Sequence, residues 1–304
     1  MYEVLGMICA KNIVRALRLP FVLASVLPFI FGSLLAKDKF NGLNFILGLA
    51  VVAATHLCAN LINDYADSES GVDWRDRKFY GFFGGSKLIQ EGVFAERFYF
   101  NLALFFGGLA FLGIAALAIS LKSFSIIGFY LLILFLGWSY SMKPIQFAYR
   151  GLGELIIFTL FGPAVVMGGY FIQTKIFPAG EIFILSLPFG LFTTALLFAN
   201  EIPDFTQDKK SAKFTWVNLL GPQKSFLVYY LLMSLGFLSI FLAVYLGYLT
   251  KLAILCIFFI PPTIKSGYIL QKYWMDKDKL VESSKLTIAI QALASLILIL
   301  DLLL

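Results

Sequence analysis

Apolar runs of helical length recur along the whole chain, and short polar segments separate them. A helix of about 20 apolar residues spans a lipid bilayer. The runs are continuously apolar and do not alternate as the strands of a membrane barrel do, so they favour helices. The pattern predicts nine membrane-spanning helices, at about 19–36, 43–65, 98–120, 123–142, 152–174, 181–201, 223–247, 251–271 and 285–304.

The composition points to lipid as the main solvent of the chain. Of the 304 residues, 60% are hydrophobic and 14% are charged. Soluble domains, in contrast, are about half apolar and about a quarter charged. We therefore expect an all-α, multi-pass integral membrane protein with a single domain over residues 1–304.

The cysteines and the histidine exclude several kinds of metal site. Cys9, Cys58 and Cys256 lie far apart and form no CxxC pair. A zinc site, an iron–sulfur cluster and a disulfide framework are therefore not expected. The single histidine, His56, cannot build a site of several histidines, and we expect it to be a packed polar residue near a helix end.

The polar connections differ in length, and their charges orient the chain. Long polar segments follow the second and sixth predicted helices, and shorter charged ones follow the fourth and eighth. Every even-numbered helix then ends on the same side of the bilayer as the N-terminus. The positive-inside rule assigns the more basic side to the cytoplasm. Only five of the 24 basic residues fall on the opposite side, namely Lys37, Lys39, Lys122, Lys175 and Lys251.

Similar polar sequences end the second and the sixth predicted helix. One is Asn60-Leu-Ile-Asn-Asp-Tyr-Ala-Asp67, and the other is Asn200-Glu-Ile-Pro-Asp-Phe-Thr-Gln-Asp208. Each has an Asn, an Asp four residues later and a further Asp. The match suggests an internal duplication, with related halves at 1–142 and 152–270 and a last helix after them. The alternation of the helices places both sequences on the same side of the membrane.

Helical spacing places the carboxylates of each sequence together. The first set lies at i, i+3, i+4 and i+7 and the second at i, i+4 and i+8, and each spacing forms one helix face. Asp208 leaves the second face if Pro203 breaks that helix. Asp73 lies beyond the first set, in the loop after Gly71. The expected metal ligands are Asn63, Asp64, Asp67, Asp73, Asn200, Asp204 and Asp208.

So many carboxylates at a bilayer boundary repel one another and are costly to bury. A divalent cation removes both problems, and ligands that are all oxygens favour Mg²⁺ or Ca²⁺ over zinc or copper. Magnesium usually binds a few carboxylates together with waters and substrate phosphates. The two clusters therefore predict a Mg²⁺–diphosphate site.

Basic residues on the same side fit a diphosphate, because Arg binds phosphate in a bidentate manner and Lys acts as a point charge. The alternative is that they only follow the positive-inside rule. Lys143 is a strong candidate because it lies just past a helix end, in Tyr140-Ser-Met-Lys-Pro144. The candidate diphosphate ligands are Asn60, Arg18, Arg75, Arg77, Lys87, Lys143 and Arg150.

These residues resemble the motifs of the UbiA-type intramembrane prenyltransferases over essentially the whole chain. Asn63-Asp-Tyr-Ala-Asp67 with Gly71-Val-Asp73 resembles the first Asp-rich motif of the family, and Asp204-Phe-Thr-Gln-Asp208 resembles the second. Tyr140-Ser141 with Lys143-Pro144 resembles the stretch after the fourth helix. Gly84-Gly-Ser-Lys-Leu-Ile-Gln-Glu-Gly92 and Arg150-Gly-Leu-Gly-Glu154 resemble the menaquinone branch, whose members prenylate 1,4-dihydroxy-2-naphthoate. Lys87 departs from the Arg-rich segment that many members of other branches carry.

The resemblance implies nine helices around a central cavity that is capped on the cytoplasmic side. It also implies Mg²⁺-dependent transfer of a polyprenyl group from a diphosphate to an aromatic acceptor, with two Mg²⁺ ions. Ionisation of the donor would form an allylic carbocation, which an electron-rich ring attacks. The implied catalytic residues are Asp67, Asp204, Asp208, Lys143 and Tyr140.

Two alternatives stay open at this point. The acceptor could instead be 4-hydroxybenzoate, a geranylgeranylglyceryl phosphate or haem, and the sequence carries no pocket motif that separates these. The chain could also be a transporter or a cation channel with acidic gates, although transporters tend to place their sites near the bilayer midplane. Here the acidic residues cluster on one side, and Asp301 in the last helix is expected to be an end group. The expected partners are a prenyl diphosphate, an aromatic acceptor and bilayer lipid, with no nucleic acid and an undetermined oligomeric state.

Overall fold

The computed structural model describes residues 2–177 and 180–304. Its α-helices are α1 (Tyr2–Leu17), α2 (Leu23–Leu34), α3 (Gly42–Glu69), α4 (Glu96–Leu121), α5 (Ser125–Ser141), α6 (Gly153–Thr159), α7 (Val165–Thr174), α8 (Gly180–Lys210), α9 (Trp216–Leu220), α10 (Pro222–Tyr245), α11 (Ile260–Lys272) and α12 (Lys277–Leu303). Short helical turns join them, namely η1 (Leu19–Val22), η2 (Lys37–Lys39), η3 (Asp73–Arg75), η4 (Phe147–Tyr149), the π-helical η5 (Leu160–Ala164) and η6 (Lys251–Phe259).

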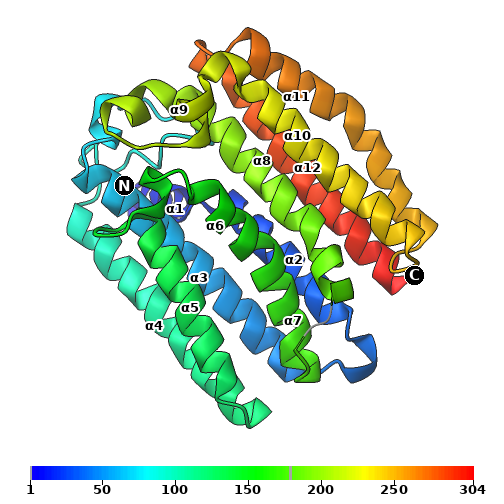
Figure 1. The fold of residues 1–304 in the computed structure, drawn as a ribbon. Helices are drawn as coiled ribbons and strands as arrows, with labels where there is room; N and C mark the ends of the chain where they lie inside the picture. The colour runs from blue at the N-terminus through cyan, green and yellow to red at the C-terminus, as the bar shows by residue number, and fades with distance from the viewer. Residues whose placement is uncertain (1, 178–179) are drawn as a thin grey trace.

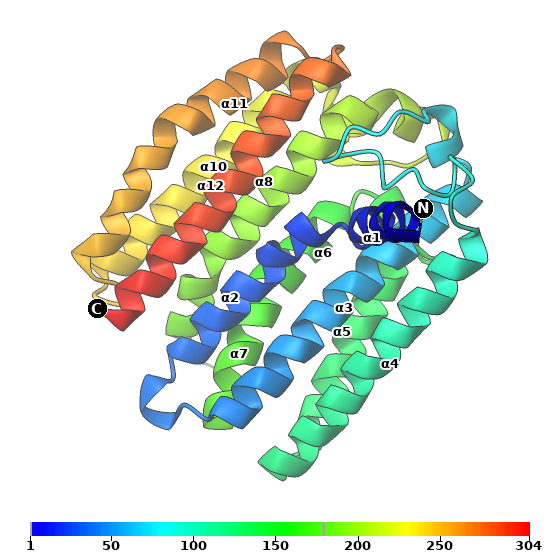
Figure 2. The same cartoon turned by 180° about the vertical axis from the view of Figure 1, so that it is seen from behind.

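The long helices run roughly side by side in one bundle (Figure 1). Helices α3, α4 and α5 form one side, and α8, α10, α11 and α12 form the other, with α2, α6 and α7 between them (Figures 1 and 2). The all-α prediction is confirmed. Helix α1 lies across the end of the bundle, because Arg18 adopts a left-handed conformation with φ of 50° and bends the chain before α2.

The outer surface of the bundle is unusually apolar. Large side chains stand well exposed on several helices and their connections, among them Ile119 (74%), Phe124 (77%) and Phe258 (71%). Contiguous exposed apolar surface is rare on soluble monomers. These positions are therefore where the chain contacts lipid.

The predicted count of nine spans is not confirmed. In the described part of the chain, seven helices are long and apolar enough to cross a membrane. The pair Ala10–Leu17 and Leu19–Leu34, bent by 41°, makes eight if it counts as one span. The remaining predicted span, at 123–142, corresponds to α5, an apolar helix of only 17 residues. It is shorter than the roughly 20 residues that span a bilayer without tilt.

The two motif-bearing helices extend beyond their predicted ends. Helix α3 continues to Glu69, and α8 runs through Pro203 to Lys210 without a break. Asp204 and Asp208 therefore both lie on α8, and the alternative in which Asp208 comes from a loop is wrong. The two helices carry their polar ends to the same end of the bundle.

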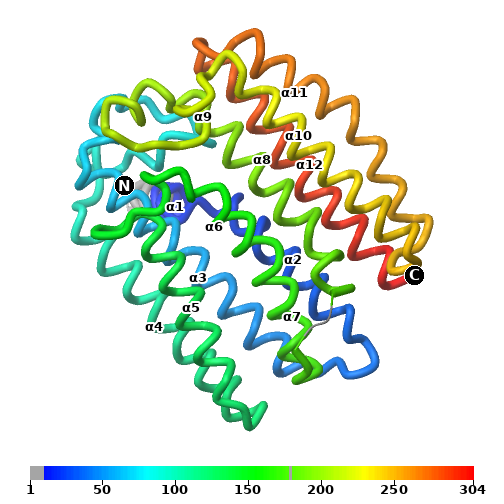
Figure 3. Tube along the Cα trace, in the orientation of Figure 1, coloured from blue at the N-terminus to red at the C-terminus, as the bar shows by residue number. Residues whose placement is uncertain are grey.

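The long loop between α3 and α4 covers this end of the bundle, beside the connection from α8 to α10 (Figure 3). Phe83, which is 2% exposed, packs in the core cluster that contains α8 and α10, whereas Leu88, at 0%, packs against α3 and α4. Apolar burial therefore fastens the loop to both sides of the bundle, above the ends of α3 and α8.

Candidate active site

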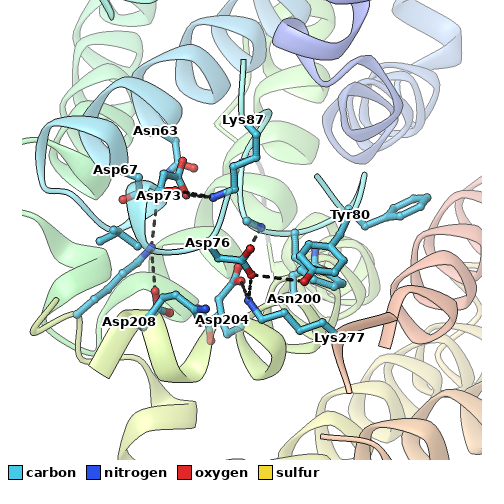
Figure 4. Close-up of a pocket in the computed structure, with 18 of the residues that line it drawn as sticks. Asn63, Asp67, Asp73, Asp76, Tyr80, Lys87, Asn200, Asp204, Asp208 and Lys277 are labelled. Carbon is cyan, nitrogen blue, oxygen red and sulfur yellow. Dashed lines mark hydrogen bonds and ion pairs between the residues drawn. The ribbon is translucent and has the colours of Figure 1, made fainter. Parts of the chain in front are cut away.

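A polar pocket of about 110 Å³ lies where the ends of α3 and α8 meet the covering loop (Figure 4). Both motif sequences contribute to its wall, as predicted from their shared side of the membrane. The polar lining residues are Arg18, Asn63, Asp67, Asp73, Asp76, Lys78, Tyr80, Lys87, Tyr140, Asn200, Glu201, Asp204, Gln207, Asp208, Lys213 and Lys277.

The first wall of the pocket comes from α3 and the start of the loop. Asp67 Oδ1 accepts a hydrogen bond from the Tyr149 hydroxyl at 2.9 Å, and Asp67 Oδ2 lies 3.4 Å from Lys213 Nζ. Asp73, which is 5% exposed, pairs with Lys87 at 2.8 Å. Each carboxylate therefore has a lysine beside it and faces the pocket with its remaining acceptor capacity.

The second wall comes from the end of α8. Asp204 Oδ2 accepts a hydrogen bond from the backbone N–H of Gly84 at 3.0 Å, and its Oδ1 lies 3.5 Å from Lys277 Nζ. Asp208 Oδ1 is buried without a hydrogen-bond partner, and its nearest cation is Lys213 at 3.9 Å. A buried carboxylate oxygen without a partner is costly. Such an atom is available to a ligand.

Glycines in the covering loop allow it to approach the carboxylates. Gly84 and Gly85 have φ values of +73° and +76°, a region that side chains rarely adopt. A Cβ atom at Gly85 would lie 2.6 Å from Asp73 Oδ2 and 3.3 Å from Asp64 Oδ1. The backbone can pass between these two carboxylates only because this position has no side chain.

Asp64 points away from the pocket, behind the loop. Its Oδ2 accepts a hydrogen bond from the backbone N–H of Ser86 at 3.0 Å, and its Oδ1 lies 3.5 Å from Arg18. The predicted single face of α3 is therefore divided in two. Asn63 and Asp67 face the pocket, whereas Asp64 and Asn60, which donates to the Leu17 carbonyl at 3.2 Å, face the loop and the end of α1.

Four lysines line the pocket, and one of them, Lys78, pairs with the exposed Asp278. The other three lie beside the pocket carboxylates, and two of these were not predicted. Lys87 is the predicted one. Lys213 lies between Asp67 and Asp208, after the end of α8, and Lys277 comes from the first turn of α12. Lys213 is only five residues past Asp208, a proximity that the sequence could have revealed. Lys277 lies far from both motifs in sequence, and no motif marks it.

The charged groups in the loops shift one another's pKa values. Burial, followed by the charge of Asp67, raises the pKa of Asp73 to about 7, although Lys87 opposes this shift. Burial alone would lower the pKa of Lys213, but Asp67 and Asp208 outweigh it and hold that pKa well above its usual value. Lys213 therefore stays charged and acts as a fixed counter-ion between the two walls.

The described residues contain no compact group of three or more Asp, Glu, His or Cys side chains that forms a finished metal site. The pocket nevertheless fits a hard divalent cation. Its donors are carboxylate and amide oxygens from two facing walls, and the Asp208 Oδ1 atom has no hydrogen-bond partner. Oxygen donors of this kind suit Mg²⁺. Asn63 Nδ2 donates a hydrogen bond to the Ser141 hydroxyl at 2.9 Å, and Asn200 Oδ1 accepts one from the Ser284 hydroxyl at 2.7 Å, so both amide groups have a fixed orientation.

Five of the seven predicted diphosphate ligands lie outside the pocket wall, and Asn60, which bonds to the Leu17 carbonyl, is one of them. Lys143 and Arg150 line a separate, open cavity of about 640 Å³, which Tyr149 also lines. Arg75 bonds to the Ser211 hydroxyl at 3.1 Å, and Arg77 stacks over the Trp74 ring. Of the predicted set, Arg18 and Lys87 line the pocket, and so does the predicted catalytic Tyr140.

Comparisons with known proteins agree with this fold. Residues 25–290 match the model of the UbiA prenyltransferase family. The 1,4-dihydroxy-2-naphthoate octaprenyltransferase of Haemophilus influenzae is 29% identical over 233 residues, which cover 73% of this chain and 72% of that protein. The human UbiA prenyltransferase domain-containing protein 1 is 32% identical over 243 residues, or 76% of this chain and 67% of that protein.

Solved structures show the same fold. A UbiA homologue from Aeropyrum pernix superposes with a TM-score of 0.72 at 18% identity, over 92% of this chain and 97% of the homologue. A UbiA homologue from Archaeoglobus fulgidus, solved with DMAPP and Mg²⁺, superposes with a TM-score of 0.61 at 16% identity, over 92% and 98% of the two chains. The family match, together with the paired Asp-rich helix ends, shows that this chain belongs to the UbiA family of membrane prenyltransferases.

Proposed function

We propose that the protein transfers a polyprenyl group from a prenyl diphosphate to 1,4-dihydroxy-2-naphthoate, in a reaction that depends on two Mg²⁺ ions. The observation that carries the proposal is the pair of carboxylate walls from α3 and α8, with an unpartnered Asp208 oxygen between them. The acceptor is that of the Haemophilus influenzae relative. The metal and the diphosphate are those bound by the Archaeoglobus fulgidus homologue.

The pocket residues divide the work of the reaction. Asn63, Asp67, Asn200, Asp204 and Asp208 would hold the metal, and Asp73 lies beside them. Bound Mg²⁺ supplies positive charge that makes diphosphate a better leaving group.

Lys87, Lys213 and Lys277 add fixed positive charge around the same space, where the negative charge of the leaving group develops. The allylic carbon–oxygen bond breaks with its electron pair on the diphosphate, and an electron-rich ring carbon then bonds to the prenyl carbon. That ring carbon loses the group it carried, a proton or its carboxyl group as CO₂, and the ring becomes aromatic again. The Tyr140 ring lines the pocket and presents a face that can stabilise a carbocation.

The covering loop excludes water from this step. It is fastened by Phe83 and Leu88 and by the hydrogen bond from Gly84 to Asp204. A carbocation that meets water is hydrolysed, so a closed pocket protects the reaction. The pocket side of the membrane is the basic side, and we propose that it faces the cytoplasm.

The test is a transfer assay with purified protein in lipid nanodiscs and labelled geranylgeranyl diphosphate. The acceptor panel contains 1,4-dihydroxy-2-naphthoate, 4-hydroxybenzoate, geranylgeranylglyceryl phosphate and haem. We expect labelled product only with the naphthoate, only with Mg²⁺, and not after EDTA treatment. Product with another acceptor would replace the proposed substrate, and product at full rate in EDTA would remove the metal from the mechanism. Absence of prenyl transfer, with ion flux in liposomes, would support a transporter instead.

A further inference from the structure

Lys277 reaches the pocket from a part of the chain that neither motif includes. It is the first residue of α12, and Asp276 caps this helix by accepting a hydrogen bond from the Lys279 N–H at 3.3 Å. Among the lining residues that the structure describes, Lys277 alone comes from α11, α12 or the segment between them. The first turn of the last helix therefore places one cation directly in the site.

The surroundings of Lys277 suit a residue that exchanges partners. Its ammonium group lies 2.9 Å from Asp76 Oδ2 and 3.5 Å from Asp204 Oδ1, and 5.4 Å from the centre of the Tyr80 ring (Figure 4). Its side chain is 19% exposed. Burial alone would raise the pKa of Asp76, but the hydrogen bond and the charge of Lys277 bring it below its usual value. Asp76 is therefore the closer of the two anionic partners of this lysine.

Asp204 differs from Asp76 because it is one of the proposed metal ligands. A metal ion that binds Asp204 would replace the weaker contact of this carboxylate with Lys277 at 3.5 Å. The contact with Asp76 at 2.9 Å would keep the lysine at the edge of the pocket. Lysine is a flexible point charge with three donors. Its free donors then face the space between the two carboxylate walls, where a diphosphate would lie.

We propose that Lys277 binds the diphosphate of the prenyl donor, and so makes the last helix a third wall of the site beside α3 and α8. This inference rests on the proposed function. It assigns the ligand class, a diphosphate, to a residue that sequence motifs do not reveal.

A neighbouring ion pair provides a matched control. Lys78 and Asp278 join the covering loop to the same first turn of α12 at 2.6 Å, but their side chains are 55% and 70% exposed. An exposed pair of this kind contributes little to stability. Asp278→Asn therefore breaks a link between the same two segments without removing a cation from the pocket. If Lys277 only fastens the loop, the two variants should behave alike.

The test measures the binding of inorganic pyrophosphate with Mg²⁺, and of geranylgeranyl S-thiolodiphosphate, which ionises poorly, by calorimetry on the detergent-solubilised full chain. We expect Lys277→Gln to weaken both by about 10-fold or more, as for the loss of one charge-assisted hydrogen bond. Lys277→Arg should restore part of this binding, and Asp278→Asn should bind as the wild type does. Thermal unfolding of each variant checks that the fold is kept.

Two results overturn the assignment of Lys277 while the proposed function stands. One is wild-type pyrophosphate affinity in Lys277→Gln, and the other is an equal loss in Lys277→Gln and Asp278→Asn. If the wild type itself binds no pyrophosphate with Mg²⁺, the proposed function and the inference fail together.

Discussion

The carboxylate of Asp64 accepts a hydrogen bond from the backbone N–H of Ser86 at 3.0 Å, and this contact joins α3 to the loop that covers the pocket. Asp64 is 3% exposed, and Arg18 lies 3.5 Å from its other oxygen. Asp67, less than one turn further along the same helix, faces the pocket instead. The two neighbouring aspartates of one motif therefore have different tasks.

We expect Asp64→Ala to destabilise the protein, because the buried Ser86 N–H loses its acceptor and Arg18 its partner. A buried donor without a partner costs about 1–3 kcal/mol. Asp64→Asn keeps a side-chain oxygen for Ser86 and should recover most of the loss. Thermal unfolding in detergent measures the difference. Equal melting temperatures for wild type and Asp64→Ala would show that the contact does not hold the loop.

Asp67→Ala and Asp204→Ala should abolish prenyl transfer, because each removes a carboxylate from one wall of the metal site. Both should still insert and elute as folded protein, since each residue lies at a helix end rather than in the apolar core. The measurements are product formation with Mg²⁺ and size-exclusion elution. Normal turnover in either variant would contradict the assignment of these two residues.

Gly85→Ala should impair transfer far more than Gly84→Ala. Both positions have positive φ, which costs a side-chain-bearing residue roughly 1–2 kcal/mol. Only at Gly85 does the added Cβ also meet a carboxylate, at 2.6 Å from Asp73, whereas the nearest atom at Gly84 is 3.5 Å away. Comparing kcat and KM for the prenyl diphosphate separates the backbone strain that both share from the clash that one has. Similar kinetics for the two variants would count against this reading of the loop.

Lys213→Met should make the protein depend on Mg²⁺ for stability. The variant leaves Asp67 and Asp208 without their shared counter-ion, and buried unpaired carboxylates are destabilising. Mg²⁺ binds the native site and so raises stability by mass action. We therefore expect a lower melting temperature than wild type in EDTA, and a larger increase on adding Mg²⁺. If Mg²⁺ raised the melting temperature of the variant no more than that of the wild type, Lys213 would not neutralise the carboxylates that bind the metal.

Asp301→Ala should lower stability and leave transfer unchanged. Asp301, which is 3% exposed, accepts hydrogen bonds from the Thr250 hydroxyl at 2.6 Å and from the N–H groups of Thr250 and Ala253, both at 2.9 Å. It thus caps the start of η6. Thermal unfolding and the transfer assay, run on the same preparation, check both halves of the expectation. Loss of transfer without loss of stability would point to a functional role.

Spacing along the helices predicted the pocket residues that share a wall. Asn63 and Asp67, and likewise Asn200, Asp204 and Asp208, lie on one face because residues four apart on a helix are neighbours. The family and the all-α membrane fold were also predicted correctly. The internal duplication of the chain stays a prediction.

The features that were missed depend on tertiary packing. Spacing shows that Asp64 lies near Asp67, but it does not show which of them faces the pocket. That depends on where the loop packs, because the backbone N–H of Ser86 donates a hydrogen bond to Asp64. The packing of α12 brings Lys277 to the site. No local sequence pattern predicts how α12 packs. The count of nine spans is not confirmed because α5 has only 17 residues, and hydropathy alone does not locate the end of a helix.

The ion pairs of the pocket can form only in the order in which the ribosome makes their residues. Asp73 meets Lys87 only 14 residues later, so that ion pair can form as soon as the first half has emerged. Asp67 must wait 146 residues for Lys213, and Asp76 must wait 201 residues for Lys277. Since chains emerge at roughly 5–20 residues per second, these acidic groups remain without their lysines for many seconds during membrane insertion. The site is completed last by the C-terminal helix, so a truncated nascent chain would carry the acidic motifs but not the finished pocket.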